Sequence, residues 1–472
     1  MRLQKQGDAS QPAERFEKKR KGRDRMARRK GALALAGLMI VSALSGCTAG
    51  SSGGSGGGNG QAVQNSGKAE PPKSAEPVEL VVADGLGDFP LERFNKVFAE
   101  PVKKKYPHIT LKWIAAGDIS KRITAGEPID LVISSSGLLQ ARLVDFGLQY
   151  DVTPLIKKYN YDLSKVEPAA LDMFKKFGNG AVWGIPSFMS PSPLYYNKDV
   201  FDKFGVPYPK DGTTWDDLNE LSKKLTRLDG NEQYYGLFLS FAHVIRRNQY
   251  SLNVVDPATS KAAFNTDAWK SVFEQSGQFY RNPNMNMTTA SAALAFQRDA
   301  FIKKRSVAMW LPVSTLHTEA ELQGMNWDMA SFPTYKDKPN VGPQPYPVAF
   351  FVTTSSKYKD DAFQVASFMA TEEYQMEWVK KGEFLTALKN DTLRKSFGAD
   401  TSLYKGKNIK AMLPDTYAPA SALTKYNSAA ETIMNNTFTK YILNQTDLNT
   451  ALRGAEEETN KKIAELQAAE KK

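Results

Sequence analysis

A proline-marked stretch at residues 184–199, GIPSFMSPSPLYYNKD, constrains most strongly what this chain can fold into. Pro186, Pro191 and Pro193 each fix φ and lack a backbone N–H donor, so the stretch cannot be a helix and is a poor central strand. It suits an extended crossing between two folded bodies. Residues 328–335, DMASFPTY, form a second extended stretch marked by a proline. Two crossings predict two lobes joined by a hinge, with a cleft between them.

The charge of the chain lies mainly at its N-terminus. The 472 residues, 41% of them hydrophobic, suffice for two or three domains and carry a formal net charge of +11. The first thirty residues hold twelve Lys or Arg and four Asp or Glu, so the rest of the chain carries about +3, which is 11 less 8. A nearly balanced body without a basic stripe is a poor candidate for binding phosphate backbones, so we expect no nucleic-acid partner. The three histidines and the single cysteine show no metal-ligand spacing, and we expect neither a metal nor a cofactor.

The N-terminal segment has the pattern of an export signal. An apolar run at residues 31–44, too short to span a bilayer, follows the basic leader and ends at the sequence LSGC, residues 44–47. This resembles the bacterial lipoprotein signal, in which Cys47 is lipidated and becomes the mature N-terminus; the alternative is a buried free cysteine. Residues 1–46 are therefore read as leader and signal peptide, with translation expected to start at Met26. Residues 47–77 form a Gly/Ser-rich flexible tether.

Strands and helices alternate after the tether. Strands are expected at residues 78–83, 109–114 and 129–133, with helical segments between them, which predicts a parallel sheet. Ligands of such sheets bind at the carboxyl ends of the strands, here residues 84–88 and 134–137. Turn formation and helix capping account for the same aspartate and serines, so both interpretations stay open.

Beyond the first crossing, Thr214 and Asp217 are spaced as a capping box at a helix start. Asp229-Gly230 predicts a turn entering a strand. Residues 307–311 are expected to form a strand buried on both faces. A strand at residues 348–354 and a helix at 360–370 follow, and residues 447–469 have the spacing of a closing amphipathic helix.

Several motifs, in their order along the chain, resemble a known family. They are Gly-Ile-Pro at 184–186 with LYYNKDVF at 194–201, TWDDL at 214–218, Ala-Met-Trp at 308–310 and Phe-Pro at 332–333. The family is the family 1 extracellular solute-binding proteins, the sugar-binding lipoproteins of ATP-binding-cassette (ABC) importers, which include maltose-binding-protein-like members. The resemblance covers residue 78 to the C-terminus.

The resemblance implies an α/β fold, a two-lobed periplasmic-binding-protein type II clamshell. Each lobe would be a mainly parallel sheet flanked by helices, and crossing hinge strands would join the lobes. Residues 78–188 and 334–371 would form lobe 1, and residues 189–333 and 372–472 would form lobe 2.

The family's positions, carried over motif by motif, imply nine ligand contacts and no catalytic residue. These are Asp84, Asp88, Ser135, Ser136, Ser190, Ser240, Phe241, Trp310 and Tyr417. Core packing is the competing interpretation for Phe241 and Trp310, and a solvated loop position for the others. Ser190 stands where maltose-binding relatives have a carboxylate, which argues against maltose as the ligand.

The expected function is that of a solute-binding component of an ABC transporter. It would be a monomer, exported across the cytoplasmic membrane and anchored to its outer face by the lipid on Cys47. Lobe closure would capture a carbohydrate, expected to be an oligosaccharide, and deliver it to the transmembrane subunits of the permease.

Three alternatives stay open from the sequence. One is a surface lipoprotein that hydrolyses glycans, although no Gly-x-Ser-x-Gly, His-Glu-x-x-His or phosphate-loop motif occurs. The paired carboxylates at residues 216–217 and 372–373 lie on expected helix surfaces. The second keeps the fold and binds a non-sugar solute such as an anion, polyamine or peptide. The third is a ligand sensor that acts through a membrane receptor.

Overall fold

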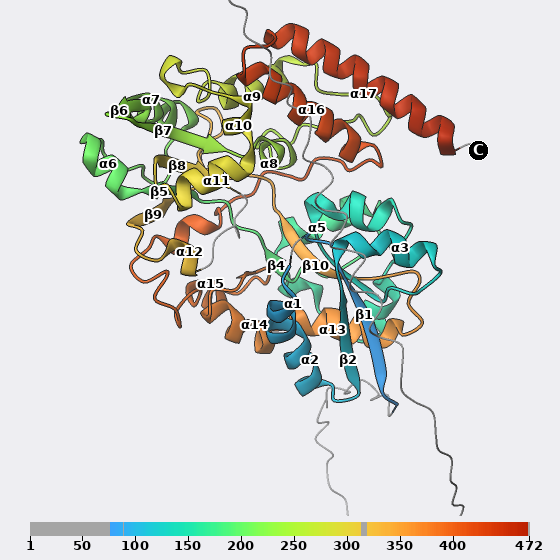
Figure 1. Cartoon of the computed structure of the whole chain (residues 1–472). Coiled ribbons are helices and arrows are strands. Elements are labelled where there is room, and N and C mark those ends of the chain that lie inside the picture. The colour runs from blue at the N-terminus through green and yellow to red at the C-terminus, as the bar shows by residue number, and fades with distance from the viewer. Residues whose placement is uncertain (1–75, 88, 313–318, 471–472) are drawn as a thin grey trace, which may run out of the picture. The chain divides into compact units, whose positions relative to one another are not determined.

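Two β-sheets organise the described part of the chain. The computed structural model describes residues 76–87, 89–312 and 319–470. A six-stranded sheet has the order β11-β4-β10-β3-β1-β2, and a five-stranded sheet has the order β6-β7-β8-β5-β9 (Figure 1). The strands are β1 (Val78–Asp84), β2 (Ile109–Ile114), β3 (Leu131–Ser135), β4 (Phe188–Met189), β5 (Leu194–Asn197), β6 (Arg227–Asp229), β7 (Glu232–Leu239), β8 (Val307–Leu311), β9 (Trp327–Ala330), β10 (Pro347–Val352) and β11 (Leu385–Thr386).

The six-stranded sheet, called the first sheet here, is covered by helices on both faces. Leu80 and Val82 of β1 contribute to one core and Ala83 to another, as expected from side chains that alternate between the faces of a strand. The helical segments of this part are α1 (Leu91–Phe94), η1 (Asn95–Ala99), α2 (Glu100–Lys105), η2 (Ala116–Asp118), α3 (Ile119–Thr124), η3 (Ser136–Leu138), η4 (Gln140–Val144), α4 (Thr153–Lys158), η5 (Leu163–Lys165), α5 (Pro168–Phe177), α13 (Lys359–Met369), α14 (Glu372–Lys380) and α15 (Asp391–Lys395).

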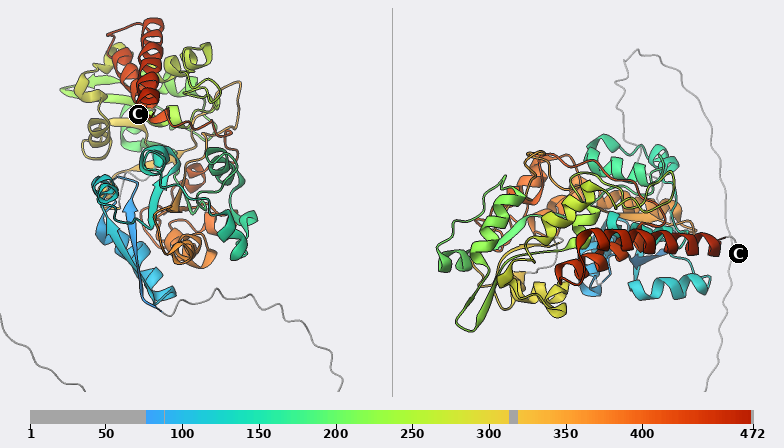
Figure 2. Two further views of the ribbon diagram at one scale, coloured as in Figure 1. Left: turned by 90° about the vertical axis from the view of Figure 1, so that its right-hand side faces the viewer. Right: turned by 90° about the horizontal axis from the view of Figure 1, so that it is seen from above.

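The five-stranded sheet, called the second sheet, packs into one large core with its helices. These segments are α6 (Lys198–Phe204), α7 (Trp215–Leu225), α8 (Phe241–Arg246), α9 (Asp267–Gly277), η6 (Pro283–Met285), α10 (Thr289–Ala292), α11 (Leu294–Ile302), α12 (Glu319–Leu322), η7 (Ile409–Met412), α16 (Asn427–Ile442) and α17 (Leu448–Glu470). The long helix α17 lies against α16, and Figure 2 shows the pair from two further sides.

The expectation of mainly parallel sheets is wrong. β1 pairs in parallel with β2 and β3, and β7 with β8, but the other strand pairs run antiparallel. The reason lies in the return of the chain from the second sheet. Val348 at the start of β10 pairs with Ser135 at the end of β3, so the chain re-enters the first sheet at the carboxyl end of β3 and must run against it.

The first crossing contains two short strands, contrary to the expectation from its prolines. β4 lies between β11 and β10, and β5 lies between β8 and β9, so both occupy central positions. Pro186, Pro191 and Pro193 flank these strands and do not lie within them, so no ladder hydrogen bond is lost. The crossing itself is therefore the short segment between β4 and β5, and the return crossing joins β9 to β10. The chain then crosses a third time, after α15, to reach η7, α16 and α17 in the core of the second sheet, which the two predicted crossings did not include.

Several local predictions are confirmed. Thr214 accepts a hydrogen bond from the backbone N–H of Asp217, and the Asp217 side chain accepts one from the Thr214 backbone, which is the predicted capping box. β8 is buried along its whole length. Ala451, Leu452, Ala455 and Ile463 of α17 are buried, so the closing helix is amphipathic as expected.

The lobe boundaries stay a prediction. Tyr374 and Trp378 of α14 pack into the core of the first sheet, and β11 pairs with β4 there, although the sequence analysis assigns residues 372–472 to lobe 2. The leader, the tether and Cys47 lie outside the described residues, as does Asp88. Within the described ranges, the structure contains no helix both long enough and apolar enough to cross a membrane.

Candidate functional site

The carboxyl end of β3 meets the return crossing. Ser135 lies at the end of β3, and its hydroxyl is 3.5 Å from the hydroxyl of Tyr346, which directly precedes β10. The backbone N–H of Ser190, in the first crossing, donates to the carbonyl of Tyr346 at 2.9 Å. A Cβ atom at Gly137 would collide with the ring of Tyr346, so a glycine is required where this ring approaches the β3 loop. Tyr346 of the return crossing is therefore in contact with the end of β3, with the loop that follows it and with the first crossing.

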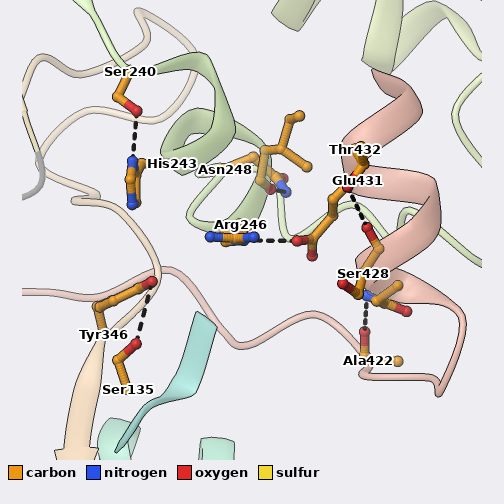
Figure 3. A network of polar contacts seen from close by, with 12 residues as sticks. Ser135, Ser240, His243, Arg246, Asn248, Tyr346, Ala422, Ser428, Glu431 and Thr432 are labelled. Atoms are coloured by element: carbon orange, nitrogen blue, oxygen red, sulfur yellow. Dashed lines mark hydrogen bonds and ion pairs between the residues drawn. The ribbon is translucent and has the colours of Figure 1, made fainter. Parts of the chain in front are cut away.

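Helix α8 brings polar side chains from the second sheet to the same place. This helix follows β7. Its residue Arg246 forms an ion pair with Glu431 on α16, and the distance between Nε of Arg246 and Oε2 of Glu431 is 2.7 Å. Figure 3 shows Arg246 and Glu431 pointing toward each other, with Tyr346 and Ser135 nearby. The Arg246 and Glu431 side chains are 22% and 13% exposed, so this ion pair is largely shielded from water.

Burial and charge act together on this ion pair. Burial disfavours the charged guanidinium of Arg246, but Glu431 and Tyr346 outweigh it and raise the Arg246 pKa. Burial also raises the pKa of Glu431, and the contact with Arg246 offsets that only in part. The pair therefore combines an arginine held firmly in its charged form with a carboxyl group that is a better proton acceptor than an exposed glutamate.

Two further residues of the α8 region, the half-buried His243 and the buried Arg247, form hydrogen bonds with neutral groups. Nδ1 of His243 is 2.6 Å from the hydroxyl of Ser240, and burial together with Arg246 and Arg247 holds the pKa of His243 well below its usual range. Arg247 donates from Nη1 to the hydroxyl of Ser192 and from Nε to the carbonyl of Gln344, at 3.2 Å for the latter. Burial lowers the pKa of Arg247 to about 10.

These groups border a small cavity, which we call the inner cavity. Its volume is about 80 Å³. On the side of the first sheet the lining comes from η3, η4 and α5, and α8, the return crossing, the segment before α16 and the start of α16 contribute most of the rest. The lining residues are Ser136, Gly137, Leu138, Gln140, Ala141, Met173, Phe177, Ile245, Arg246, Val254, Gln344, Tyr346, Ser421, Ala422, Leu423, Asn427, Ser428 and Glu431. The cavity thus offers carboxylate, guanidinium, amide and hydroxyl groups and one phenol ring.

Among the nine predicted contacts, Ser136 lines the inner cavity. Ser135 and Ser190 each form a hydrogen bond with Tyr346. Ser240 forms one with His243, which lies one helical turn before Arg246. Tyr417 is close enough to Arg247 to be affected by its charge, and burial raises its pKa. These contacts with a ligand stay predictions.

Three of the predicted residues have structural roles here. Asp84 accepts hydrogen bonds from the backbone N–H groups of Leu86, Gly87 and Phe89 at 2.8, 3.0 and 3.0 Å, which is the turn-forming alternative. The ring of Phe241 stacks on that of Phe438 at 3.6 Å between centroids, within the core. Trp310 is fully buried in the core of the second sheet, so it presents no surface to a ligand in this structure.

Four residues of this site were not predicted from the sequence: Arg246, Gln344, Tyr346 and Glu431. Two signals were present: four polar residues, Arg246 to Gln249, follow an apolar segment, and Tyr346 stands between two prolines just before a strand. Glu431 had no signal, because it is one of several polar residues on α16 and only the packing of α16 against α8 selects it.

Nothing in the described ranges suggests a metal centre, since no three His, Cys, Asp or Glu side chains gather closely enough there to hold an ion.

Comparison with known proteins places this arrangement among binding proteins. The family described as "Bacterial extracellular solute-binding protein" matches residues 90–376, more than half of the chain. The arabinooligosaccharide-binding protein of Bacillus subtilis is 36% identical over 80 residues, 17% of this chain and 17% of its own length. The mannitol-binding protein of Pseudomonas aeruginosa is 26% identical over 175 residues, 35% of this chain and 37% of its own length. The matched regions are therefore well under two thirds of either relative.

A solved structure extends the likeness over most of the fold. The ABC substrate-binding protein of Listeria monocytogenes in complex with cycloalternan superimposes with a TM-score of 0.64 at 20% identity, covering 82% of this chain and 100% of that one.

Proposed function

The chain belongs to the bacterial extracellular solute-binding proteins, and on that premise we propose that it captures a carbohydrate outside the cell and delivers it to an ABC permease. The match to the family model confirms the family predicted from the sequence motifs, and the likeness to the solved structure confirms the two-lobed α/β fold. The proteins similar to it bind an arabinooligosaccharide, mannitol or cycloalternan according to their names, which supports a carbohydrate as the solute.

The inner cavity is the observation that carries this proposal. Sugar hydroxyls both donate and accept hydrogen bonds, so a sugar site needs both kinds of group on a rigid frame. Arg246 supplies donors, Glu431 supplies acceptors, and the amide of Gln140 supplies both. Asn427 can add a donor, since its amide oxygen already accepts hydrogen bonds from Thr424. Tyr346 adds an aromatic ring of the kind on which the C–H face of a sugar packs.

Capture would work by closure of the two lobes. The cavity takes its lining from the helices and connecting segments around both sheets, so a bound sugar makes all of its contacts only when both sides approach it. A ligand shifts a two-state equilibrium by its difference in affinity for the two states, and the closed state gains the additional contacts. The closed form would be the one that the permease recognises.

The proposed role is non-enzymatic. Hydrolysis of a glycosidic bond ordinarily requires two carboxyl groups on either side of the bond, about 5 to 10 Å apart. Of the described residues that line the inner cavity, Glu431 alone carries a carboxyl group, and it is engaged by Arg246. The geometry therefore favours binding over cleavage.

We further propose that the protein is a monomer held at the outer face of the cytoplasmic membrane by a lipid on Cys47. The support is the sequence of residues 31–47, in which a basic leader, a short apolar run and a cysteine occur in the order of a lipoprotein signal. Two acyl chains give stable attachment where one would not.

A thermal-shift screen tests the carbohydrate proposal directly. The protein from residue 74 onward is heated with monosaccharides, oligosaccharides, polyamines and peptides. A ligand at a hundred times its Kd adds about 2.7 kcal/mol of stability and raises the unfolding midpoint. We expect a sugar to do so and to be recovered unchanged. A cleaved sugar would indicate a hydrolase, and a response to polyamines or peptides alone would contradict the carbohydrate proposal.

Arg246→Gln tests the location of the site with the same assay. We expect it to lose the stabilisation by the sugar, because it removes the donor paired with Glu431. Arg122→Gln is the matched control, since Arg122 also pairs with a glutamate, Glu127, at 2.8 Å but lies away from the cavity lining. Equal sugar responses in both variants would place the site elsewhere.

A further inference from the structure

The three residues that follow helix α8 form a buried polar segment, which we call the hinge cluster. Arg247, Asn248 and Gln249 are 4%, 4% and 3% exposed. Buried polar side chains are ordinarily satisfied by hydrogen bonds, so their partners show what the segment holds in place. The side-chain amide of Gln249 donates from Nε2 to the carbonyls of Pro333 and Val341, at 3.0 and 2.6 Å. Both carbonyls belong to the return crossing.

Arg247 connects the return crossing to the first crossing. Its Nη1 donates to the hydroxyl of Ser192, between β4 and β5, and its Nε donates to the carbonyl of Gln344 at 3.2 Å. The backbone N–H of Gln344 donates in return to the carbonyl of Arg247, also at 3.2 Å. The guanidinium carbon lies 5.3 Å from the centre of the Tyr346 ring. One side chain next to α8 thus binds both crossings through the rigid fork of its guanidinium.

The same contacts reach the inner cavity. Gln344 and Tyr346 line that cavity and are also partners of Arg247. The Gln344 side chain donates from Nε2 to the carbonyl of Asn248 at 2.9 Å, and its Oε1 accepts from the N–H of Ser421 at 2.7 Å. A solute that contacts Gln344 or Tyr346 in the cavity therefore touches the residues that hold the crossings together.

The charge of Arg247 is buried without a carboxylate beside it. Within the described part of the chain, no Asp or Glu forms an ion pair with Arg247, and the groups that act on its charge are the phenols of Tyr346 and Tyr417. Burial lowers the pKa of Arg247 to about 10, so the guanidinium is still charged at neutral pH. A buried charge without a counter-ion costs folding free energy, and buried ionic groups can select one arrangement of the surrounding structure over others.

We propose that Arg247 is a positioning residue of the hinge. It holds the first crossing and the return crossing in one preferred arrangement in the free protein, and so sets the angle from which the lobes close on a solute. Loss of its hydrogen bonds would leave the two crossings free to adopt a wider range of angles. The inference rests on the proposed capture by closure, and it is independent of which solute is captured.

Pulsed electron paramagnetic resonance on the free protein measures this range of angles. Cys47 is the single cysteine, so Cys47→Ser leaves the full chain without a native one. Lys104→Cys on α2 and Glu274→Cys on α9 then place one nitroxide label beside each sheet, at exposed positions (Figure 1). The width of the distance distribution between the two labels reports how far the two parts move relative to each other.

Three variants are compared in this labelled background. Arg247→Met removes the charge and its hydrogen bonds and keeps a long apolar side chain, and Ser192→Ala removes only the acceptor on the first crossing. Arg281→Met is the matched control, because Arg281 also lies over a tyrosine ring, that of Tyr441 at 4.8 Å, but is exposed and follows α9. A cooperative urea transition shows that a variant is folded.

We expect one narrow distribution in the unaltered protein and in Arg281→Met. Arg247→Met should broaden it to about twice the width or more, and Ser192→Ala should broaden it less. A folded Arg247→Met with an unchanged width would overturn the proposal, since a loss of stability alone does not change the width. A broad distribution in the unaltered protein would overturn it as well.

If Arg247→Met does not fold, Ser192→Ala decides, and an unchanged width in that variant overturns the proposal. No solute is added in this experiment. Failure of every sugar in the thermal-shift screen would therefore overturn the carbohydrate proposal and leave the role of Arg247 intact.

Discussion

Two neighbouring arginines have different tasks at the junction of the sheets. Arg246 pairs with Glu431, which places a matched donor and acceptor in the inner cavity. Arg247 is only 4% exposed and contacts Ser192 on the first crossing and Gln344 on the return crossing. Arg246 thus lines the inner cavity, and Arg247 connects the first crossing to the return crossing. A guanidinium with its fixed fork of donors suits such bridging better than a lysine would.

The position of His243 beside these arginines predicts a pH dependence of stability. Burial, Arg246 and Arg247 hold its pKa well below the usual range. The unfolded chain takes up this proton near pH 6.5, and the folded chain does so only at lower pH. The unfolded state therefore binds more protons in that interval, and the free energy of unfolding decreases as the pH falls below about 6.5.

We expect urea unfolding to show this effect in a comparison with His243→Gln. Between about pH 7.5 and pH 5.5, the unaltered protein should lose about 1.3 kcal/mol more than the variant, provided that His243 stays neutral in the folded protein. Carboxylates that titrate in the same range are common to both proteins and cancel in the difference. Equal losses in the two proteins would show that His243 is protonated as readily in the folded state as in the unfolded one.

At the scale of elements, helix ends show how far local sequence governs this fold. α7 begins at the capping box of Thr214 and Asp217, in which each side chain satisfies a backbone N–H of the other. The hydroxyl and the N–H of Thr214 lower the pKa of Asp217, as hydrogen bonds to a carboxylate do. The helix α17, in contrast, packs its regularly spaced apolar residues against neighbouring helices, chiefly α16, and that packing stabilises it.

Thr214→Ala should lower the free energy of unfolding by about 1 kcal/mol, because an N-cap hydrogen bond is lost. Thr214→Ser keeps the hydroxyl and should cost only a few tenths of that. Chemical denaturation measures both values. A loss as large in Thr214→Ser as in Thr214→Ala would mean that the methyl group, and not the cap, stabilises this position.

At the scale of the whole molecule, the crossings between the two sheets determine what a ligand can do. The described chain passes from the first sheet to the second between β4 and β5, returns between β9 and β10, and passes to the second core again after α15. Few backbone segments connect the two cores, so relative motion of the sheets costs little, as in other hinged proteins. Because the cavity is lined from both sides, the proposed sugar binding would favour the closed state.

Small-angle X-ray scattering should detect this closure. We expect the sugar identified in the thermal screen to reduce the radius of gyration of the protein at saturation, and a sugar that gives no thermal shift to leave it unchanged. Stabilisation by the sugar without any change in the radius of gyration would contradict capture by closure.

The sequence by itself determined the local elements, the two crossings and the family. The strand at residues 78–84, the capping box at Thr214 and the closing helix follow from periodicity and capping chemistry, which act between residues close along the chain. Prolines revealed the crossing, since they restrict φ wherever they stand. The same local reasoning misjudged β4 and β5, because whether two residues pair as a strand depends on neighbours far along the chain.

Only the tertiary structure decided the direction of the strands and the composition of the site. β10 runs antiparallel because the chain returns at the carboxyl end of β3. Glu431 meets Arg246 across 185 positions of sequence, and Tyr346 lies between the first sheet and both crossings. Such contacts depend on how helices and sheets pack, and the hydrogen bonds and charges of a site form only where that packing brings distant side chains together.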